Sequence, residues 1–141
     1  MLAHAAYEEA GVAVANITGN DVKSDQRFMP RCIYTIPPLA SVGLTRTEAE
    51  KMGYSVTVGQ ADYRANGMAA AEGEEGCTFA VLDSKSRRCL GFSCVGAGAP
   101  EMINAASIAL ERGYTSDSWR HLIVAHPSVS ETLREAVLSA E

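Results

Sequence analysis

The segment from residue 78 to residue 95 reads TFAVLDSKSRRCLGFSCV, and its pattern decides the fold. Thr78 to Asp83 and Cys89 to Val95 are mostly apolar, which is typical of strands. The residues between them, Ser84 to Arg88, are all polar or charged and indicate a turn. We therefore expect an antiparallel hairpin here.

Further strands are expected on the N-terminal side of this hairpin. Alternating apolar residues from Tyr54 to about Tyr63 predict one strand. Two shorter runs, Cys32 to Thr35 and Ala40 to Leu44, flank the pair Pro37-Pro38. Because a proline pair interrupts strand pairing, it marks a turn or a sheet edge.

Helices are predicted around these strands. Capping-box spacing from Thr45 to Glu48 opens a short helix that Gly53 can stop. Pro100 in a first turn and Gly113 past the last one bracket a helix of about twelve residues. Residues 2–15 predict a helix that ends near Gly11, or a helix followed by a short strand. A last helix is expected to start near Ser128 and to run through Leu133 and Val137.

Two polar stretches complete the outline. Residues 19–26 predict a linker or loop, and residues 67–76 fit either a helical turn or a mobile loop. The expected fold class is α+β, with an antiparallel sheet of four to five strands and helices packed on one side.

Composition bounds the function. With 141 residues and 47% hydrophobic content, the chain is long enough for one core and too short for two full domains. A net charge of −5 and a pI near 5.2 disfavour nucleic-acid binding. No apolar run is long enough for a membrane span, and acids stand where a signal peptide carries cations, so we expect an unexported protein without membrane association.

The four cysteines are expected to be reduced and structural, because nothing indicates an oxidising compartment. Cys89 and Cys94 have the C-x4-C spacing of a redox-active pair, but they lie in a predicted strand. Residues five apart in a strand face opposite sides and lie roughly 17 Å apart, beyond the reach of a disulfide. No zinc-type spacing is present, so no metal site is expected.

The segment AHPSVSE, residues 125–131, places an imidazole, a proline and a carboxylate close together. His126 suits a general base near neutral pH, and Glu131 is the candidate to orient it. Ser128 to Glu131 is also a capping box, which by spacing alone is the commoner role. One carboxylate with two oxygens can also serve both purposes.

Several motifs resemble the C-terminal interface domain of the FAD-dependent pyridine nucleotide-disulfide oxidoreductases, the family of dihydrolipoamide dehydrogenase and glutathione reductase. They occur in the family's order over nearly the whole chain, at residues 1–11, 33–35, 38–45, 91–98, 101–106, 109–111 and 125–131. Residues 101–104 and 134–136 are most like dihydrolipoamide dehydrogenase. Pro37-Pro38 is closer to glutathione reductase, and Ser128 and Val129 depart from the usual lipoamide-enzyme pattern.

The resemblance implies a role for both ends of the chain. His126 would act as the acid/base for a dithiol such as dihydrolipoamide in the partner subunit's active site, oriented by Glu131, across a cis His126–Pro127 bond. Backbone groups of Met1, Leu2 and Ala3, together with His126 and Pro127, would lie at the FAD.

The resemblance also implies an assembly. Residues 1–26 would be the tail of a preceding FAD-binding domain and 27–141 the dimerisation domain of a homodimer, with contacts through the helix at 102–110 and the C-terminal segment. FAD and NAD(P) belong to the full-length enzyme, which converts dihydrolipoamide and NAD to lipoamide and NADH, in some cases within a 2-oxo acid dehydrogenase complex. The expected compartment is the bacterial cytosol, with the mitochondrial matrix as the alternative.

The chain by itself is not expected to be a competent enzyme or to hold a cofactor. Gly96-Ala97-Gly98 lacks the third glycine of a dinucleotide-binding loop, and no P-loop is present. Alternatives are a glutathione reductase-like member, a stand-alone dimerisation module, and a small hydrolase using His126 with Ser128 or Ser130. The hydrolase is disfavoured because neither serine stands in a nucleophile elbow.

Overall fold

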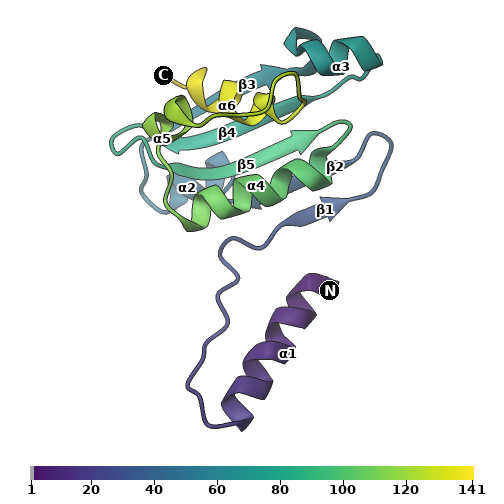
Figure 1. Cartoon of the computed structure of the whole chain (residues 1–141). Coiled ribbons are helices and arrows are strands. Elements are labelled where there is room, and N and C mark those ends of the chain that lie inside the picture. Colours follow the sequence, from purple (N-terminus) through teal and green to yellow (C-terminus); the bar gives the residue numbers. More distant parts are fainter. Residues whose placement is uncertain (1) are drawn as a thin grey trace.

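The computed structural model describes residues 2–141 and contains one five-stranded antiparallel sheet in the order β1-β2-β5-β4-β3 (Figure 1). The strands are β1 (Arg31–Ile33), β2 (Leu39–Gly43), β3 (Val56–Asp62), β4 (Cys77–Asp83) and β5 (Cys89–Val95). The helices are α1 (Ala3–Ile17), α2 (Arg46–Lys51), α3 (Gly67–Glu72), α4 (Ala99–Glu111), α5 (Ser116–His121) and α6 (Glu131–Leu138), with a 3-10 turn, η1, at Tyr63–Ala65.

The predicted hairpin is confirmed as β4 and β5, which lie at the centre of the sheet. The prolines at 37 and 38 lie in the turn between β1 and β2, and β1 is an edge strand. The pair therefore marks both a turn and a sheet edge. The α+β class and the antiparallel sheet are likewise confirmed.

The main core lies between the sheet and the helices α4 and α6. It buries Phe92 from β5, Ile103 and Leu110 from α4, and Leu133 and Val137 from α6. Each such side chain contributes about 1.5–3 kcal/mol when fully buried. Burial of these side chains therefore fixes α6, whose first turn carries Glu131, against β3 and β4.

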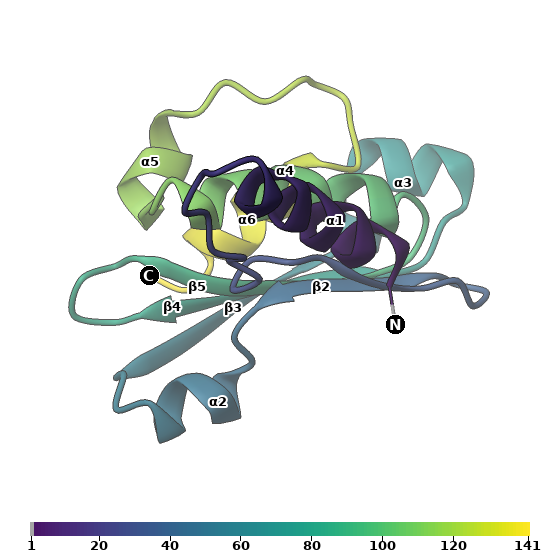
Figure 2. The ribbon, with the colours of Figure 1, turned by 90° about the horizontal axis from the view of Figure 1, so that it is seen from below.

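One helix departs from the expected one-sided packing. Figure 2 shows α2 on the face of the sheet opposite α4, α5 and α6. There Ala49 packs with Val81 and Leu90 in a second, smaller core. The Thr45 capping box that opens α2 is present as predicted, and Gly53, at φ 87°, follows its end.

The prediction that Cys89 and Cys94 face opposite sides of the sheet is wrong. Val81 pairs with Gly91 while Leu82 pairs with Cys89, so Leu90 is an extra residue in a β-bulge. The bulge turns Leu90 to the α2 face and leaves both cysteines in the main core. Both thiols are free, and burial raises the pKa of Cys89 to about 12 and of Cys94 to about 11, so they are unreactive as nucleophiles.

Two helix predictions also need correction, and one helix was not predicted at all. α1 continues through Gly11 to Ile17, because one glycine costs a helix only about 1 kcal/mol and the nearby Ala10, Ala13 and Ala15 are good helix formers. α6 begins at Glu131 rather than near Ser128. α5 was not expected; its signal was the Thr115–Ser118 capping box.

Gly91 allows the close approach of β5 to the end of β2. A Cβ atom there would lie 2.1 Å from the carbonyl oxygen of Leu44. We predict that Gly91→Ala lowers the free energy of unfolding by about 1–3 kcal/mol through overpacking, as measured by chemical denaturation. The control Gly11→Ala, with nothing within 4 Å of the added Cβ, should be neutral or stabilising; equal effects of the two variants would contradict the packing argument.

Candidate active site

His126 lies in the loop between α5 and α6, where residues 122–130 form no helix or strand. Its side chain is 79% exposed, and its peptide bond to Pro127 is cis, as the resemblance implied. The imidazole is therefore presented to the surface by a loop rather than enclosed in its own protomer.

Glu131 is the first residue of α6, and it uses its two carboxylate oxygens separately. Oε1 lies 2.9 Å from Nδ1 of His126, and Oε2 accepts the backbone N–H of Ser128 at 2.9 Å. The Ser128 hydroxyl donates to the Ala125 carbonyl oxygen, so only the carboxylate half of the predicted capping box is formed. The carboxylate thus holds the backbone of the loop just before the helix and contacts the imidazole at once.

These contacts define the tautomer of His126. The Ser128 N–H, and after it the imidazole, lower the pKa of Glu131 below its usual 4.5, so the carboxylate is ionised at neutral pH. An ionised carboxylate only accepts hydrogen bonds, so Nδ1 must donate. In the neutral ring the lone pair then lies on Nε2, which makes no hydrogen bond within residues 2–141.

The start of α6 is fixed to the body of the domain by side chains that the sequence did not point to. Thr132 and Thr78 of β4 are fully buried, and their hydroxyl oxygens lie 2.9 Å apart. Arg134 donates to the carbonyl oxygens of Trp119 and Arg120 at 3.1 Å and so joins α6 to α5. Asn66 donates to the Ser128 carbonyl oxygen at 2.9 Å. Its only sequence signal was its place as an N-cap before residues 67–72.

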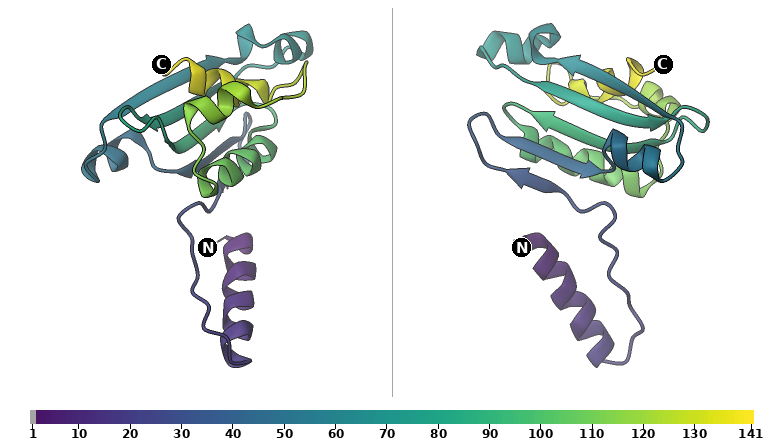
Figure 3. Two further views of the ribbon diagram at one scale, coloured as in Figure 1. Left: turned by 60° about the vertical axis from the view of Figure 1, so that its left-hand side comes forward. Right: turned by 180° about the vertical axis from the view of Figure 1, so that it is seen from behind.

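The residues near the N-terminus that were predicted to contact FAD do not lie near His126 within the protomer. Met1 lies outside the described residues, Leu2 is the N-cap of α1, and Ala3 opens that helix. α1 lies apart from the sheet, at the end of an extended linker (Figures 1 and 3). His4 Nε2 makes a hydrogen bond with the carbonyl oxygen of Pro30 at 2.7 Å, which ties α1 to the linker rather than to His126.

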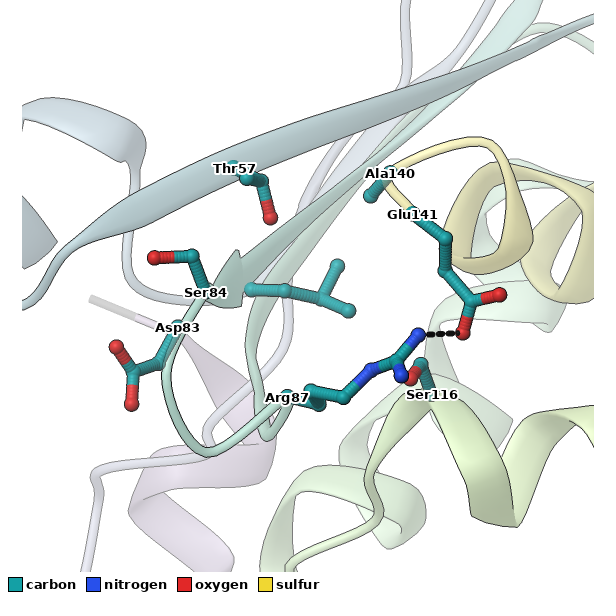
Figure 4. A pocket seen from close by; sticks show the side chains of 8 residues that line it. Thr57, Asp83, Ser84, Arg87, Ser116, Ala140 and Glu141 are labelled. Carbon is teal, nitrogen blue, oxygen red and sulfur yellow. Dashed lines mark hydrogen bonds and ion pairs between the residues drawn. The ribbon is translucent and has the colours of Figure 1, made fainter.

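A cavity of about 300 Å³ lies away from His126, between the β4–β5 turn and the C-terminal residues (Figure 4). Its charged groups are already occupied by one another. Glu141 forms ion pairs with Arg87 and Arg120, and Asp83 accepts hydrogen bonds from the backbone N–H and hydroxyl of Ser86. This cavity therefore offers no free acid or base comparable with His126.

Within residues 2–141, no three His, Cys, Asp or Glu side chains are placed to hold a metal ion together. None of its helices has the length and apolar character needed to cross a bilayer.

The family model described as "Pyridine nucleotide-disulphide oxidoreductase, dimerisation domain" matches residues 29–137. The chain belongs to this family. The match covers the whole sheet, α2 to α5 and all but the last residue of α6, and so includes the His126 loop.

Curated relatives of this dimerisation domain are dihydrolipoyl dehydrogenases. The one from Bacillus subtilis is 37% identical over 139 residues, and the one from Rhizobium etli is 41% identical over 143 residues. The mitochondrial dihydrolipoyl dehydrogenase of Sus scrofa is 37% identical over 141 residues. The matches cover 98–99% of this chain but only 28–30% of the relatives, so the chain spans less than a third of their length.

Solved structures share the fold. The HOCl-induced flavoprotein disulfide reductase RclA from Escherichia coli superposes with a TM-score of 0.84 at 27% identity, over 93% of this chain and 31% of that one. LpdA from Mycobacterium tuberculosis has a TM-score of 0.81 at 19% identity over 90% of this chain and 28% of its own, which supports the fold alone.

The lowered pKa of Glu131 predicts a pH dependence of stability. Its contribution is fully present above the unfolded pKa, near 4.5, and is lost as pH falls through the lower folded pKa. The melting temperature of wild type should therefore exceed that of Glu131→Gln near neutral pH, and the difference should shrink on acidification. Glu111→Gln is the control, because this carboxylate makes no hydrogen bond or ion pair with any described residue; a difference for Glu131→Gln that is constant with pH would refute the prediction.

Proposed function

We propose that this domain supplies His126 as the acid/base of a dihydrolipoyl dehydrogenase-type flavoenzyme, acting in the active site of the partner subunit. The observation that carries the proposal is the exposed Nε2, whose basicity is directed outward by the Nδ1 contact with Glu131 at 2.9 Å. The dihydrolipoyl dehydrogenase relatives support the choice of enzyme.

The chemistry follows from sulfur reactivity. The thiolate, not the thiol, attacks a disulfide, and a free thiol has a pKa near 8.5. Nε2 of His126 would take the proton from the substrate S–H, and the resulting thiolate would attack a disulfide on the partner subunit. Glu131 would hold the ring in place and stabilise the imidazolium that forms. That attack would form a mixed disulfide as the S–S bond breaks, and the displaced sulfur would leave as a thiolate. On the reverse path the substrate sulfur would leave the mixed disulfide as a thiolate, and the same Nε2 would return the proton to it.

The complete enzyme would also require FAD and NAD(P), and the described part of this chain fits a minor role toward FAD. Leu2 makes no side-chain capping bond, and the first turn of α1 contains no acidic residue. The N–H groups of that turn are therefore available to negative charge, which a helix N-terminus favours. Bound FAD would pass electrons between the disulfide and the nicotinamide. Leu2 and Ala3 would approach FAD through their backbone, and His126 and Pro127 would approach that of the partner.

The domain boundaries follow the same division. We propose that residues 1–26 belong to a preceding FAD-binding domain and residues 27–141 to the dimerisation domain. In support, the family match begins at residue 29, and α1 buries none of its side chains. Tyr7, Val14 and Ile17 are 78%, 60% and 84% exposed, which suits packing against a further domain.

A homodimer is proposed because the base and the disulfide would come from different subunits. Ile123 and Ile108 are 96% and 60% exposed, and both border an apolar groove of about 330 Å³ between α4 and the His126 loop. Met102 and Leu110, in the expected contact helix, instead face the domain's own core. The contact surface of α4 would therefore be the side that carries Ile108.

The substrate, complex and compartment are proposed by analogy with the relatives. Dihydrolipoamide is the proposed dithiol, with a 2-oxo acid dehydrogenase complex as the larger assembly. A glutathione reductase-like enzyme is the second candidate, because Pro37-Pro38 is closer to that pattern and Ser128-Val129 departs from the usual lipoamide-enzyme pattern. The bacterial cytosol is the proposed compartment, since bacterial relatives are among the most similar, with the mitochondrial matrix as the alternative because of the Sus scrofa relative.

In the full-length flavoenzyme, His126→Gln should lower turnover with dihydrolipoamide by about 10²- to 10⁴-fold, the usual contribution of a general base. Steady-state kinetics measures the loss, and the flavin spectrum checks that FAD stays bound. His121→Gln is the matched control, because His121 is an exposed histidine at the end of α5. Wild-type turnover of His126→Gln would refute the proposal.

The proposed contact surface has its own test. Ile123→Asp should place an unpaired charge in the dimer interface and shift the enzyme toward monomer, as measured by light scattering at micromolar concentration. Met52→Asp, on a residue 65% exposed at the end of α2, should leave the dimer intact. A dimer that is unaffected by Ile123→Asp would place the interface elsewhere.

A further inference from the structure

Asn66 is a buried polar residue that connects the His126 loop to the body of the domain. Its side chain is 2% exposed, and it lies between η1 and α3. Its Oδ1 accepts the backbone N–H of Ala69 at 3.0 Å, and its Nδ2 donates to the carbonyl oxygen of Ser128 at 2.9 Å. One amide therefore caps α3 and also holds a loop 62 residues away in sequence.

Few hydrogen bonds hold the loop at 122–130 to the body of the domain, although Val129 packs against the main core. Ser128 Oγ contacts Ala125 and Ser130, and the other hydrogen bonds of the loop reach only to neighbouring residues between 119 and 133. Across residues 2–141, the Asn66 amide makes the one hydrogen bond that joins this loop to a distant segment. Figure 1 shows the loop running from α5 along the helical face toward the end of the sheet where α3 lies.

The contacts form a continuous series from the buried body of the domain to the exposed imidazole. Asn66 Nδ2 donates to Ser128 O, the Ser128 N–H donates to Glu131 Oε2, and Glu131 Oε1 accepts from His126 Nδ1, each at 2.9 Å. Asn66 is itself fixed, since its N–H donates to the carbonyl oxygen of Tyr63, a fully buried residue. A series of hydrogen bonds thus connects the exposed imidazole to a buried residue that never touches it.

We propose that Asn66 is a positioning residue for His126, acting through Ser128 and Glu131. Without the amide N–H, the Ser128 carbonyl oxygen loses its partner in the body of the domain, and the Ser128 N–H that holds Glu131 is no longer fixed. Displacements of about 1 Å at a reacting group lower turnover by roughly 10²-fold, so a flexible loop is costly. The inference rests on the proposed function of His126.

The test uses the full-length enzyme with two variants of Asn66. Asn66→Asp and Asn66→Ser both keep an oxygen that can cap α3, but when ionised Asp has no N–H to donate, and Ser is too short to reach Ser128. Each should lower turnover with dihydrolipoamide by about 10- to 100-fold. Oxidation of NADH by ferricyanide, which uses the flavin without a thiol proton transfer, should stay at the wild-type rate. Asn66→Ser carries the test alone if the buried carboxylate of Asn66→Asp prevents folding.

A double-mutant cycle separates positioning from a general structural role. In a His126→Gln background, Asn66→Ser should cause no further loss of dithiol turnover, because its effect passes through the imidazole. Thr45→Ala, which removes a comparable cap from α2 on the opposite face of the sheet, should leave dithiol turnover unchanged in both backgrounds.

The outcomes distinguish the two proposals. Wild-type dithiol turnover in His126→Gln would overturn the proposed function, and with it this inference. A strong loss in His126→Gln combined with wild-type turnover in both Asn66 variants would overturn the inference alone. Asn66→Ser could also lower dithiol turnover equally in the wild-type and His126→Gln backgrounds, or lower ferricyanide activity as much as dithiol turnover. Either result would show that Asn66 only caps α3 and would overturn the inference.

Discussion

The Glu131 carboxylate, shared between the Ser128 N–H and the His126 imidazole, is the contact on which the candidate site depends. An exposed histidine on a loop has several rotamers and two neutral tautomers, and fixing it costs side-chain entropy. Because Oε2 is fixed by a backbone N–H, Oε1 can restrict the ring without an aromatic or apolar wall around it. The imidazole is thus oriented from behind while its Nε2 side stays open.

The fold serves this contact by making the start of α6 a fixed point. Leu133 and Val137 bury one side of the helix against the sheet, and the Thr132 and Thr78 hydroxyls pair where the helix begins. A pair of buried hydroxyl groups stabilises a fold only if both groups make hydrogen bonds. Besides its contact with Thr78, the Thr132 hydroxyl donates to the carbonyl oxygen of Val129. Packing fixes the axis of α6, and the threonine pair fixes its position along β4.

The sequence predicted those parts that depend on local patterns. The β4–β5 hairpin, the α2 capping box and the helix after Pro100 each follow from residues adjacent in the chain. The dual use of Glu131 was a hypothesis because a carboxylate has two oxygens and both partners lie within five residues.

The parts that local patterns missed depend on tertiary placement. The bulge at Leu90 is not visible in the alternation of β5, because an extra residue is defined only by the strand opposite. α5 is a short, polar helix whose burial depends on Ser116 and Trp119 meeting the core. Asn66 reads as a loop residue until Ser128, 62 positions later, is brought beside it.

Formation of the proposed dimer would change the environment that sets the pKa of Glu131. A partner subunit covering Ile123 and the adjoining loop would remove water from the carboxylate, and desolvation raises the pKa of an acid. A protonated Glu131 could donate to Nδ1 and reverse the tautomer that leaves Nε2 as the base. The Ser128 N–H, the larger cause of the lowered pKa, acts in the opposite direction and is already formed within one protomer. This hydrogen bond would therefore keep the carboxylate ionised when the interface closes, so the orientation of the proposed base depends on a backbone contact just before α6.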